Sequence, residues 1–296
     1  MPFSRTEKPQ IESYNPEDPG FKIVDVTYGF GDMEVFTRLM SEKGVLLLNM
    51  SDGANFQDFL PSLHILTAHK NKFADRVGNF YAMPFAASED IVKVAHEELR
   101  NLSGSRSDKI ISNFKPSMAQ GVRNFLHLAF ESAFIKSSNL LNQAMDNDAY
   151  INALRKNKLI CVYGGDLYRD LQKCDEFGDN SFKDNPAYQF KCLDREYLIF
   201  RWDSWRFYEA AIFGCIPINL NFTTYGMDLP VIPTDDAYVP IEFLDINKAV
   251  ERVESLFSNE SIWQETSDRI SIWSRENYTP KPLAQYVLSI LEGIYN

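Results

Sequence analysis

The residues with the clearest chemical potential lie in one stretch, SWRFYEAAIFGCIPINL, from residue 204 to residue 220. Arg206 and Glu209 are three residues apart, and the segment then becomes almost wholly apolar. An arginine near the free N–H groups at the start of a helix makes a site that favours phosphate. A carboxylate about one turn later lies on the same face and can accept from two ribose hydroxyls. The pair therefore fits a nucleoside diphosphate.

A surface ion pair is the alternative interpretation of Arg206 and Glu209, because such i,i+3 pairs are common and weak on exposed helices. The apolar residues after Glu209, and the buried strand predicted for CIPINL, favour a position at the rim of a buried helix instead. Asp203 or Ser204 precedes this helix and can cap its first turn. We therefore assign these four residues to a donor-binding site.

The same stretch resembles the donor-site segment of exostosin-like glycosyltransferases, over residues 200–233. The matching positions form a Ser/Arg/Glu pattern, a small apolar helix and GCIP, and they are Ser204, Arg206, Glu209, Ala210, Gly214, Cys215, Ile216 and Pro217. The resemblance implies the GT-B fold, with two Rossmann-like units facing each other across a cleft. It also implies sugar transfer from a nucleotide sugar to a hydroxyl of a glycan or other acceptor. Glu209 would hold the donor ribose, and Arg206 would lie near the phosphates.

Four further donor-binding candidates are predicted near the ends of strands. Lys115 and Arg123 flank the loop after the strand KIISN, and the resemblance to GT-B enzymes implies that basic residues in this loop meet the diphosphate. Gly164 and Gly165 end the strand in KLICVYGGD, where small residues let a ligand approach the backbone. A solvated loop and a simple tight turn are the alternatives.

A sugar transfer that inverts the anomeric centre needs a base for the acceptor hydroxyl. Asp52, after LLLNMS, and Asp32, after YGFG, follow predicted strands of the first unit, and we rank Asp52 first. Each could instead be a cap or turn residue, which is the commoner role of aspartate. His64 and His69, in LHILTAHK, are ranked below the two aspartates as candidates for this base.

Neither a metal site nor a cofactor is predicted besides the nucleotide-sugar substrate. The run DND, residues 146–148, lies in QAMDNDAY, which we interpret as a polar helix end without a preceding apolar strand. Asp235 and Asp236, in TDDA, are interpreted as loop residues, and the four cysteines form no C-x-x-C pair. We therefore expect metal-independent transfer.

An α/β fold with two units, the first small, is predicted from two series of alternating strands and helices, and the resemblance implies that both units are Rossmann-like. The continuous apolar run GVLLLN after a predicted helix indicates a parallel sheet buried on both faces. EYLIFRWD is read as a further strand of the second unit. The predicted division is an N-terminal extension (1–19), two Rossmann-like domains (20–107 and 108–279) and a C-terminal helix (280–296). The resemblance implies that the first domain lies on the acceptor side, that the second binds the nucleotide sugar, and that the helix packs back toward the first domain.

The charge balance and the lack of recognised targeting segments limit which partners and which location are expected. Acidic residues outnumber basic ones by 41 to 30, and the net charge of −11 argues against nucleic acid and anionic membranes as partners. No signal peptide and no membrane-spanning run is recognised, so a cytoplasmic, bacterial or virus-encoded protein is expected rather than a Golgi enzyme. Because the first unit is short, a catalytically inactive nucleotide- or glycan-binding protein is the alternative function.

Overall fold

The computed structural model describes most of the chain after residue 43 and one short segment before it. The described ranges are 22–25, 44–50, 64–72, 79–99, 106–112, 126, 133–134, 140–142, 145–163, 166–168, 189–192, 195–200, 202–242 and 245–295. Structural statements below concern these residues.

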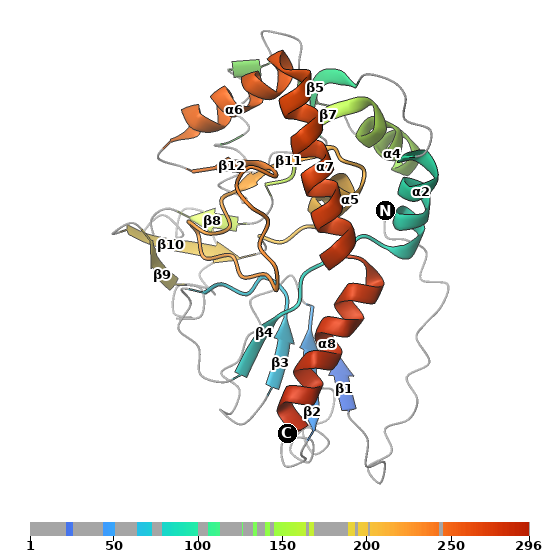
Figure 1. Ribbon diagram of the computed structural model, residues 1–296. Helices are drawn as coiled ribbons and strands as arrows, with labels where there is room; N and C mark the ends of the chain where they lie inside the picture. The colour runs from blue at the N-terminus through green and yellow to red at the C-terminus, as the bar shows by residue number, and fades with distance from the viewer. Residues whose placement is uncertain are drawn as a thin grey trace.

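Two parallel sheets form the framework of the molecule (Figure 1). The first has the order β1-β2-β3-β4, with strands Lys22–Asp25, Val45–Asn49, His64–Thr67 and Asn79–Ala82. The second has the order β12-β11-β7-β5-β6, with β5 Ser107–Ser112, β6 Leu140–Asn142, β7 Asn157–Cys161, β11 Ile216–Leu220 and β12 Val239–Ile241. The predicted α/β fold with two Rossmann-like units is confirmed.

The strand order of the second sheet indicates where a ligand would bind. The chain passes from β5 outward to β6 and then returns to β7 on the other side of β5. In open parallel sheets, ligands bind outside the carboxyl ends of the strands at the point where the order reverses. That point lies between β5 and β7 here.

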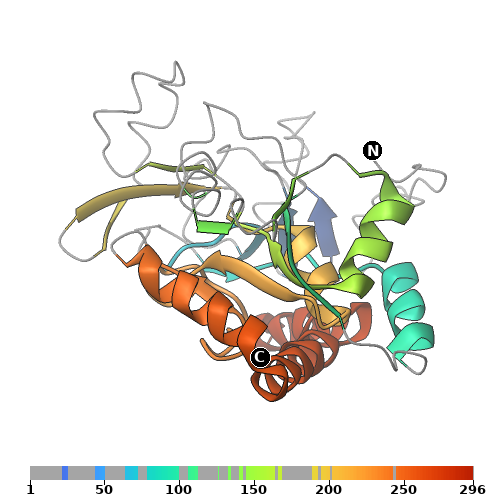
Figure 2. The same cartoon turned by 90° about the horizontal axis from the view of Figure 1, so that it is seen from above.

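Helices cover the second sheet and connect it to the first. They are α2 Glu89–Leu99, α4 Asn147–Lys156, α5 Trp205–Ile212, α6 Ile246–Ser258, α7 Glu260–Asn277 and α8 Pro280–Tyr295. Seen from above, α2 and α4 lie side by side at one end of the molecule, away from α6 (Figure 2). None of the described helices combines the length and apolarity needed to cross a bilayer.

The C-terminal helix α8 packs against the first sheet (Figure 1). Its Ile290 and Leu291 form one buried cluster with Leu46 of β2 and Leu66 of β3. The helix α2, which precedes residue 107, contributes Ile91 and Ala95 to the larger core of the second unit instead. The boundary at residues 107 and 108 stays a prediction.

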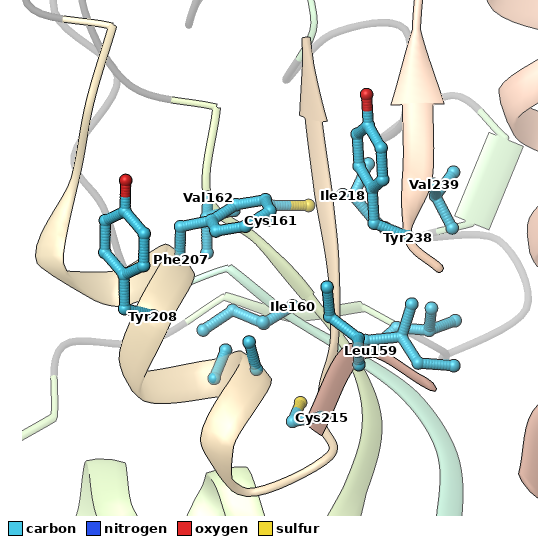
Figure 3. Packing of buried hydrophobic residues seen from close by; sticks show 14 of the residues in the cluster. Leu159, Ile160, Cys161, Val162, Phe207, Tyr208, Cys215, Ile218, Tyr238 and Val239 are labelled. Atoms are coloured by element: carbon cyan, nitrogen blue, oxygen red, sulfur yellow. The ribbon is translucent and has the colours of Figure 1, made fainter. Parts of the chain in front are cut away.

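The core of the second unit lies between the parallel strands and α5 (Figure 3). Phe207 and Tyr208 of α5 are buried in this core, and β7 is buried along its whole length. Cys161 and Cys215 are free thiols within this core, and burial raises the pKa of each to about 12. They therefore act as small apolar residues rather than as nucleophiles.

The serines of α7 bond the carbonyl groups near the end of α5. Three hydroxyls donate to them: Ser267 to Gly214 (2.7 Å), Ser271 to Ile212 (3.2 Å) and Ser274 to Tyr208 (3.3 Å). The last carbonyls of a helix have no partner within the helix. A polar stripe on α7 satisfies this end of α5 and lets the two helices approach closely.

Arg106 also bonds carbonyl groups at helix ends. Its buried guanidinium donates to the carbonyls of Leu154 (3.1 Å), near the end of α4, and of Phe213, at the end of α5. Arg106, within the polar segment LSGSRSD, is thus a buried residue that joins two helix ends.

One predicted strand pairs differently from expectation. The segment EYLIFRWD contains β10, Arg195–Phe200, but β10 lies in a separate antiparallel sheet between β8, Asp166–Tyr168, and β9, Gln189–Cys192. The strand forms as predicted, but it does not belong to the five-stranded parallel sheet of the second unit. Only two residues separate β9 from β10, and so short a connection suits an antiparallel hairpin, whereas parallel strands need a long crossover.

Candidate functional site

Helix α5 begins at the carboxyl edge of the second sheet. The ring of Phe207, in its first turn, meets Phe222, just beyond β11, at 5.2 Å between centroids. Ser204 occupies the N-cap position with an extended backbone, but its side chain makes no capping hydrogen bond. Asp203 Oδ1 instead accepts from the Ser204 N–H at 2.9 Å. This bond is to the N-cap residue itself and not to an N–H of the first turn, so the predicted side-chain cap by Asp203 or Ser204 is not formed.

Asp203 links the start of α5 to the segment after β4. Its Oδ2 accepts from the Phe85 N–H at 2.7 Å, and its Oδ1 accepts from the Tyr208 hydroxyl at 2.8 Å. The side chain is buried, and this burial raises the pKa of the carboxyl to about 6, although nearby His69 and the hydrogen bonds oppose the shift. Asp203 is therefore an anchor inside the protein rather than an exposed ligand-binding group.

His69 lies directly against this anchor. Its Nδ1 accepts from the Asp203 N–H at 3.0 Å, and its ring meets Phe85 and Trp202 edge-on. A backbone N–H can only donate, so Nδ1 is the acceptor in this hydrogen bond. His69 also has a positive φ of 55°, a strained value for a non-glycine residue. The structure thus places His69, the lower-ranked candidate for the base, beside Asp203, a predicted donor-site residue.

The pKa of Asp203 predicts a measurable pH dependence of stability. The folded value of about 6 exceeds the ordinary value of 3.8, so folding favours the protonated carboxyl. Its contribution is fully present below pH 4 and is lost as the pH rises through 6. Relative to Asp203→Asn, which does not ionise, the wild type should gain up to about 3 kcal/mol between pH 7 and pH 4. Urea unfolding of both proteins across this range is the measurement, and a pH-independent difference would contradict it.

The segment after β3 is fastened to the segment after β11. Asn71 and Met227 form an isolated antiparallel bridge. Three hydrogen bonds accompany it: Lys72 N–H to the Gly226 carbonyl (2.6 Å), Asp228 N–H to the Lys70 carbonyl (2.9 Å) and the Asn71 amide to the Tyr225 carbonyl (2.8 Å). Asp228 also pairs with the Lys70 ammonium. The carboxyl ends of strands from the two sheets are thereby held together.

Arg206 and Glu209 are partly buried at the start of α5. Among the ion pairs of the described residues there is none between them, so the surface ion pair considered from the sequence is not formed. Burial raises the pKa of Glu209, and the Tyr150 hydroxyl and the Arg206 charge act in the opposite direction. The three side chains form one cluster at the carboxyl edge of the sheet, where phosphate and hydroxyl groups can be bound.

Tyr150 was missed in the sequence, because the segment around it was interpreted as a helix end. The structure shows that a helix begins there: Asp146 caps α4, and its Oδ1 accepts from the Ala149 N–H at 2.8 Å. Aspartate is a favoured residue at the N-cap, so Asp146 could have indicated from the sequence that a helix begins here. Within the described ranges, no group of three His, Cys, Asp or Glu side chains could hold a metal ion.

Six candidate residues lie outside the described residues. They are the proposed bases Asp52 and Asp32 and the donor-binding candidates Lys115, Arg123, Gly164 and Gly165. In the sequence, Lys115 comes three residues after the end of β5, and Gly164 comes three residues after the end of β7. These two strands flank the reversal of strand order, where a ligand would bind. Because Lys115 and Gly164 lie outside the described residues, their donor-binding roles remain predictions.

A polar pocket of about 490 Å³ lies beyond the ends of β11 and β12. Asn221, which is buried, donates from its amide to Glu242 at 3.2 Å and to Asp235 at 3.4 Å. The Thr224 hydroxyl also donates to Glu242, at 3.1 Å. Asp235 therefore lines a pocket, and carboxylates and hydroxyls of this kind can bond a polyhydroxylated ligand.

The comparisons with known proteins give similarities of structure alone. No protein-family profile and no curated protein matches the sequence. An alpha-glucosyltransferase in complex with UDP-glucose and DNA containing an abasic site is 10% identical, with 91% of this chain and 79% of that chain covered and a TM-score of 0.47. An alpha-glucosyltransferase with UDP and a 13-mer DNA containing a HMU base is 10% identical over 84% and 79%, with a TM-score of 0.46. A third, in complex with UDP, is 11% identical over 91% and 80%, with a TM-score of 0.43.

The expectation that nucleic acid is not a partner was wrong. Two of these three similar structures hold DNA. The expectation rested on the net charge of −11, which is a property of the whole chain. Nucleic-acid binding depends on the local field of a groove or patch, so the net charge does not decide it.

Proposed function

We propose that this protein is a glycosyltransferase that moves a sugar from a nucleotide sugar to an acceptor hydroxyl. The observation that carries the proposal is the Arg206–Glu209 pair at the start of α5. The two side chains are partly buried, are not paired with each other and lie at the carboxyl edge of a parallel sheet. The resemblance of residues 200–233 to the exostosin-like donor site supports the same function and stays part of the proposal.

The roles of the residues follow from their chemistry. Arg206 and the N–H groups of the first turn of α5 bind the diphosphate, and Glu209 accepts from the two ribose hydroxyls. The bond between the anomeric carbon and the phosphate oxygen breaks, the acceptor oxygen bonds to that carbon, and the nucleoside diphosphate leaves. A base on the first unit takes the acceptor proton, and Asp52 remains the first candidate. The acceptor we propose is a glycan or glycoconjugate hydroxyl.

A hydrolysis assay with a panel of nucleotide sugars tests this function. One donor should be cleaved slowly in water and faster with its acceptor, and EDTA should leave the rate unchanged because we propose a metal-independent reaction. Oligosaccharides and DNA containing hydroxymethylated bases serve as acceptor arms. Binding without turnover would support the catalytically inactive alternative. Loss of activity in EDTA, restored by manganese, would overturn metal independence.

A further inference from the structure

Tyr150 of α4 has a buried hydroxyl beside the proposed ribose-binding carboxylate. Only 8% of the residue is exposed, and the hydroxyl lies away from solvent. Within the described part of the chain, this oxygen has no hydrogen bond of ordinary geometry. Buried hydroxyls nearly always have a partner, because leaving one unpaired is unfavourable. Such a group in a site suggests a bond that forms in another state.

Glu209 is the acceptor available to this hydroxyl. The two side chains are close enough for each to influence the ionisation of the other, although their contact falls outside ordinary hydrogen-bond geometry. Glu209 is the more exposed of the two side chains, so it is the one more accessible to a ligand.

Building on the proposed function, we propose that Tyr150 is a positioning residue for Glu209. When the ribose hydroxyls donate to the Glu209 carboxylate, the Tyr150 O–H also donates to this carboxylate and fixes its orientation. A carboxylate has acceptor sites for about four hydrogen bonds, so one bond from Tyr150 leaves room for both ribose hydroxyls. The contact between the two side chains, which already lowers the pKa of Glu209 without ligand, becomes a hydrogen bond of ordinary geometry in the same step.

The groups that act on Glu209 define the expected pH effect. They are Tyr150 from α4 and Arg206 from α5, and both hold the pKa of Glu209 down against the effect of burial. Cys215, which acts on Tyr150, is a neutral buried thiol with a pKa of about 12. Removing the Tyr150 hydroxyl should therefore raise the pKa of Glu209, and nucleotide binding should be lost at a higher pH on acidification.

The test compares the wild type, Tyr150→Phe and the control Tyr238→Phe. The control removes another buried hydroxyl, one that accepts from the Phe222 N–H at 3.2 Å. Calorimetry with UDP, ADP, GDP and CDP from pH 5 to 8 should show affinity reduced about two- to tenfold in Tyr150→Phe, with the acid limb moved to higher pH. The control Tyr238→Phe should match the wild type in affinity and in the position of the acid limb. An unchanged pH profile in Tyr150→Phe would reject the inference even if its affinity or stability fell.

A ligand-free measurement separates this inference from the proposed function. The carboxyl carbon of Glu209 can be titrated by NMR in the wild type and in Tyr150→Phe without nucleotide. A higher pKa of Glu209 in the variant supports the positioning role, and an unchanged value overturns it. If the wild type binds none of the four nucleotides while the pKa moves, the proposed function fails and the Tyr150–Glu209 coupling stands.

Discussion

Glu209→Ala should lower the affinity for the nucleotide donor at least tenfold. The change removes a charged acceptor from two ribose hydroxyls, and hydrogen bonds to charged groups contribute about 1.5–3 kcal/mol each. Every 1.4 kcal/mol is a factor of ten, so loss of one bond already gives the tenfold effect. The nucleoside and the nucleoside diphosphate should be weakened about equally, because both carry the ribose. Calorimetry with both ligands is the measurement.

Two variants make this result specific. Arg206→Ala should weaken the diphosphate far more than the nucleoside, because its partner is phosphate. Glu276→Ala removes an exposed carboxylate from α7 and should leave both affinities unchanged. If Glu209→Ala folds normally and binds both ligands like the wild type, the start of α5 is ordinary packing and the donor-site assignment is rejected.

Gly214→Ala should destabilise the protein by about 2–5 kcal/mol. Gly214 follows α5 with φ +68°, and its N–H and that of Cys215 return to the carbonyls of Ala211 and Ala210, which is the Schellman pattern. A side chain in this conformation costs about 1–2 kcal/mol. The added Cβ would also lie 2.5 Å from Ser267 Oγ, and crowding of this kind costs about 1–3 kcal/mol. Urea unfolding measures the sum.

The two causes can be separated with further variants. Ser267→Ala removes the atom that the new Cβ would meet, so combining it with Gly214→Ala should leave mainly the backbone term, visible as a non-additive double-mutant cycle. Gly293→Ala is the control, because its Cβ would meet no atom within 4 Å. Since Gly293 lies within helix α8, that change should stabilise by about 0.5–1 kcal/mol. Equal effects of the two glycine changes would disprove the argument.

Elements with a strong local signal were predictable from the sequence. The continuous apolar run GVLLLN indicates a buried strand, and the apolar residues of DINKAVERVESLF recur at helical spacing. Both elements, β2 and α6, form close to these positions. Helix α7 was missed for a physical reason. Its contact face includes Ser267, Ser271 and Ser274, which pair with α5 carbonyls, so buried positions carry residues that are usually exposed.

The candidate site was only partly predictable because its parts come from distant segments. The Arg206–Glu209 pair could be found from spacing and composition. His69 and Asp203 are 134 residues apart, and Arg106 and Phe213 are 107 residues apart. No local pattern reports such contacts, since they depend on how the strands are ordered. Tyr150 likewise meets Glu209 only because α4 and α5 lie on the same sheet.

The packing of α8 on the first sheet also affects how the chain can fold as it is synthesised. Leu46 and Leu66 leave the ribosome more than 200 residues before Ile290 and Leu291, which share their buried cluster. Domains usually fold as units during synthesis, starting from the N-terminus. The first sheet cannot complete its apolar cluster until α8 is released, so this unit, although made before the second one, completes its packing only after the second unit has been synthesised.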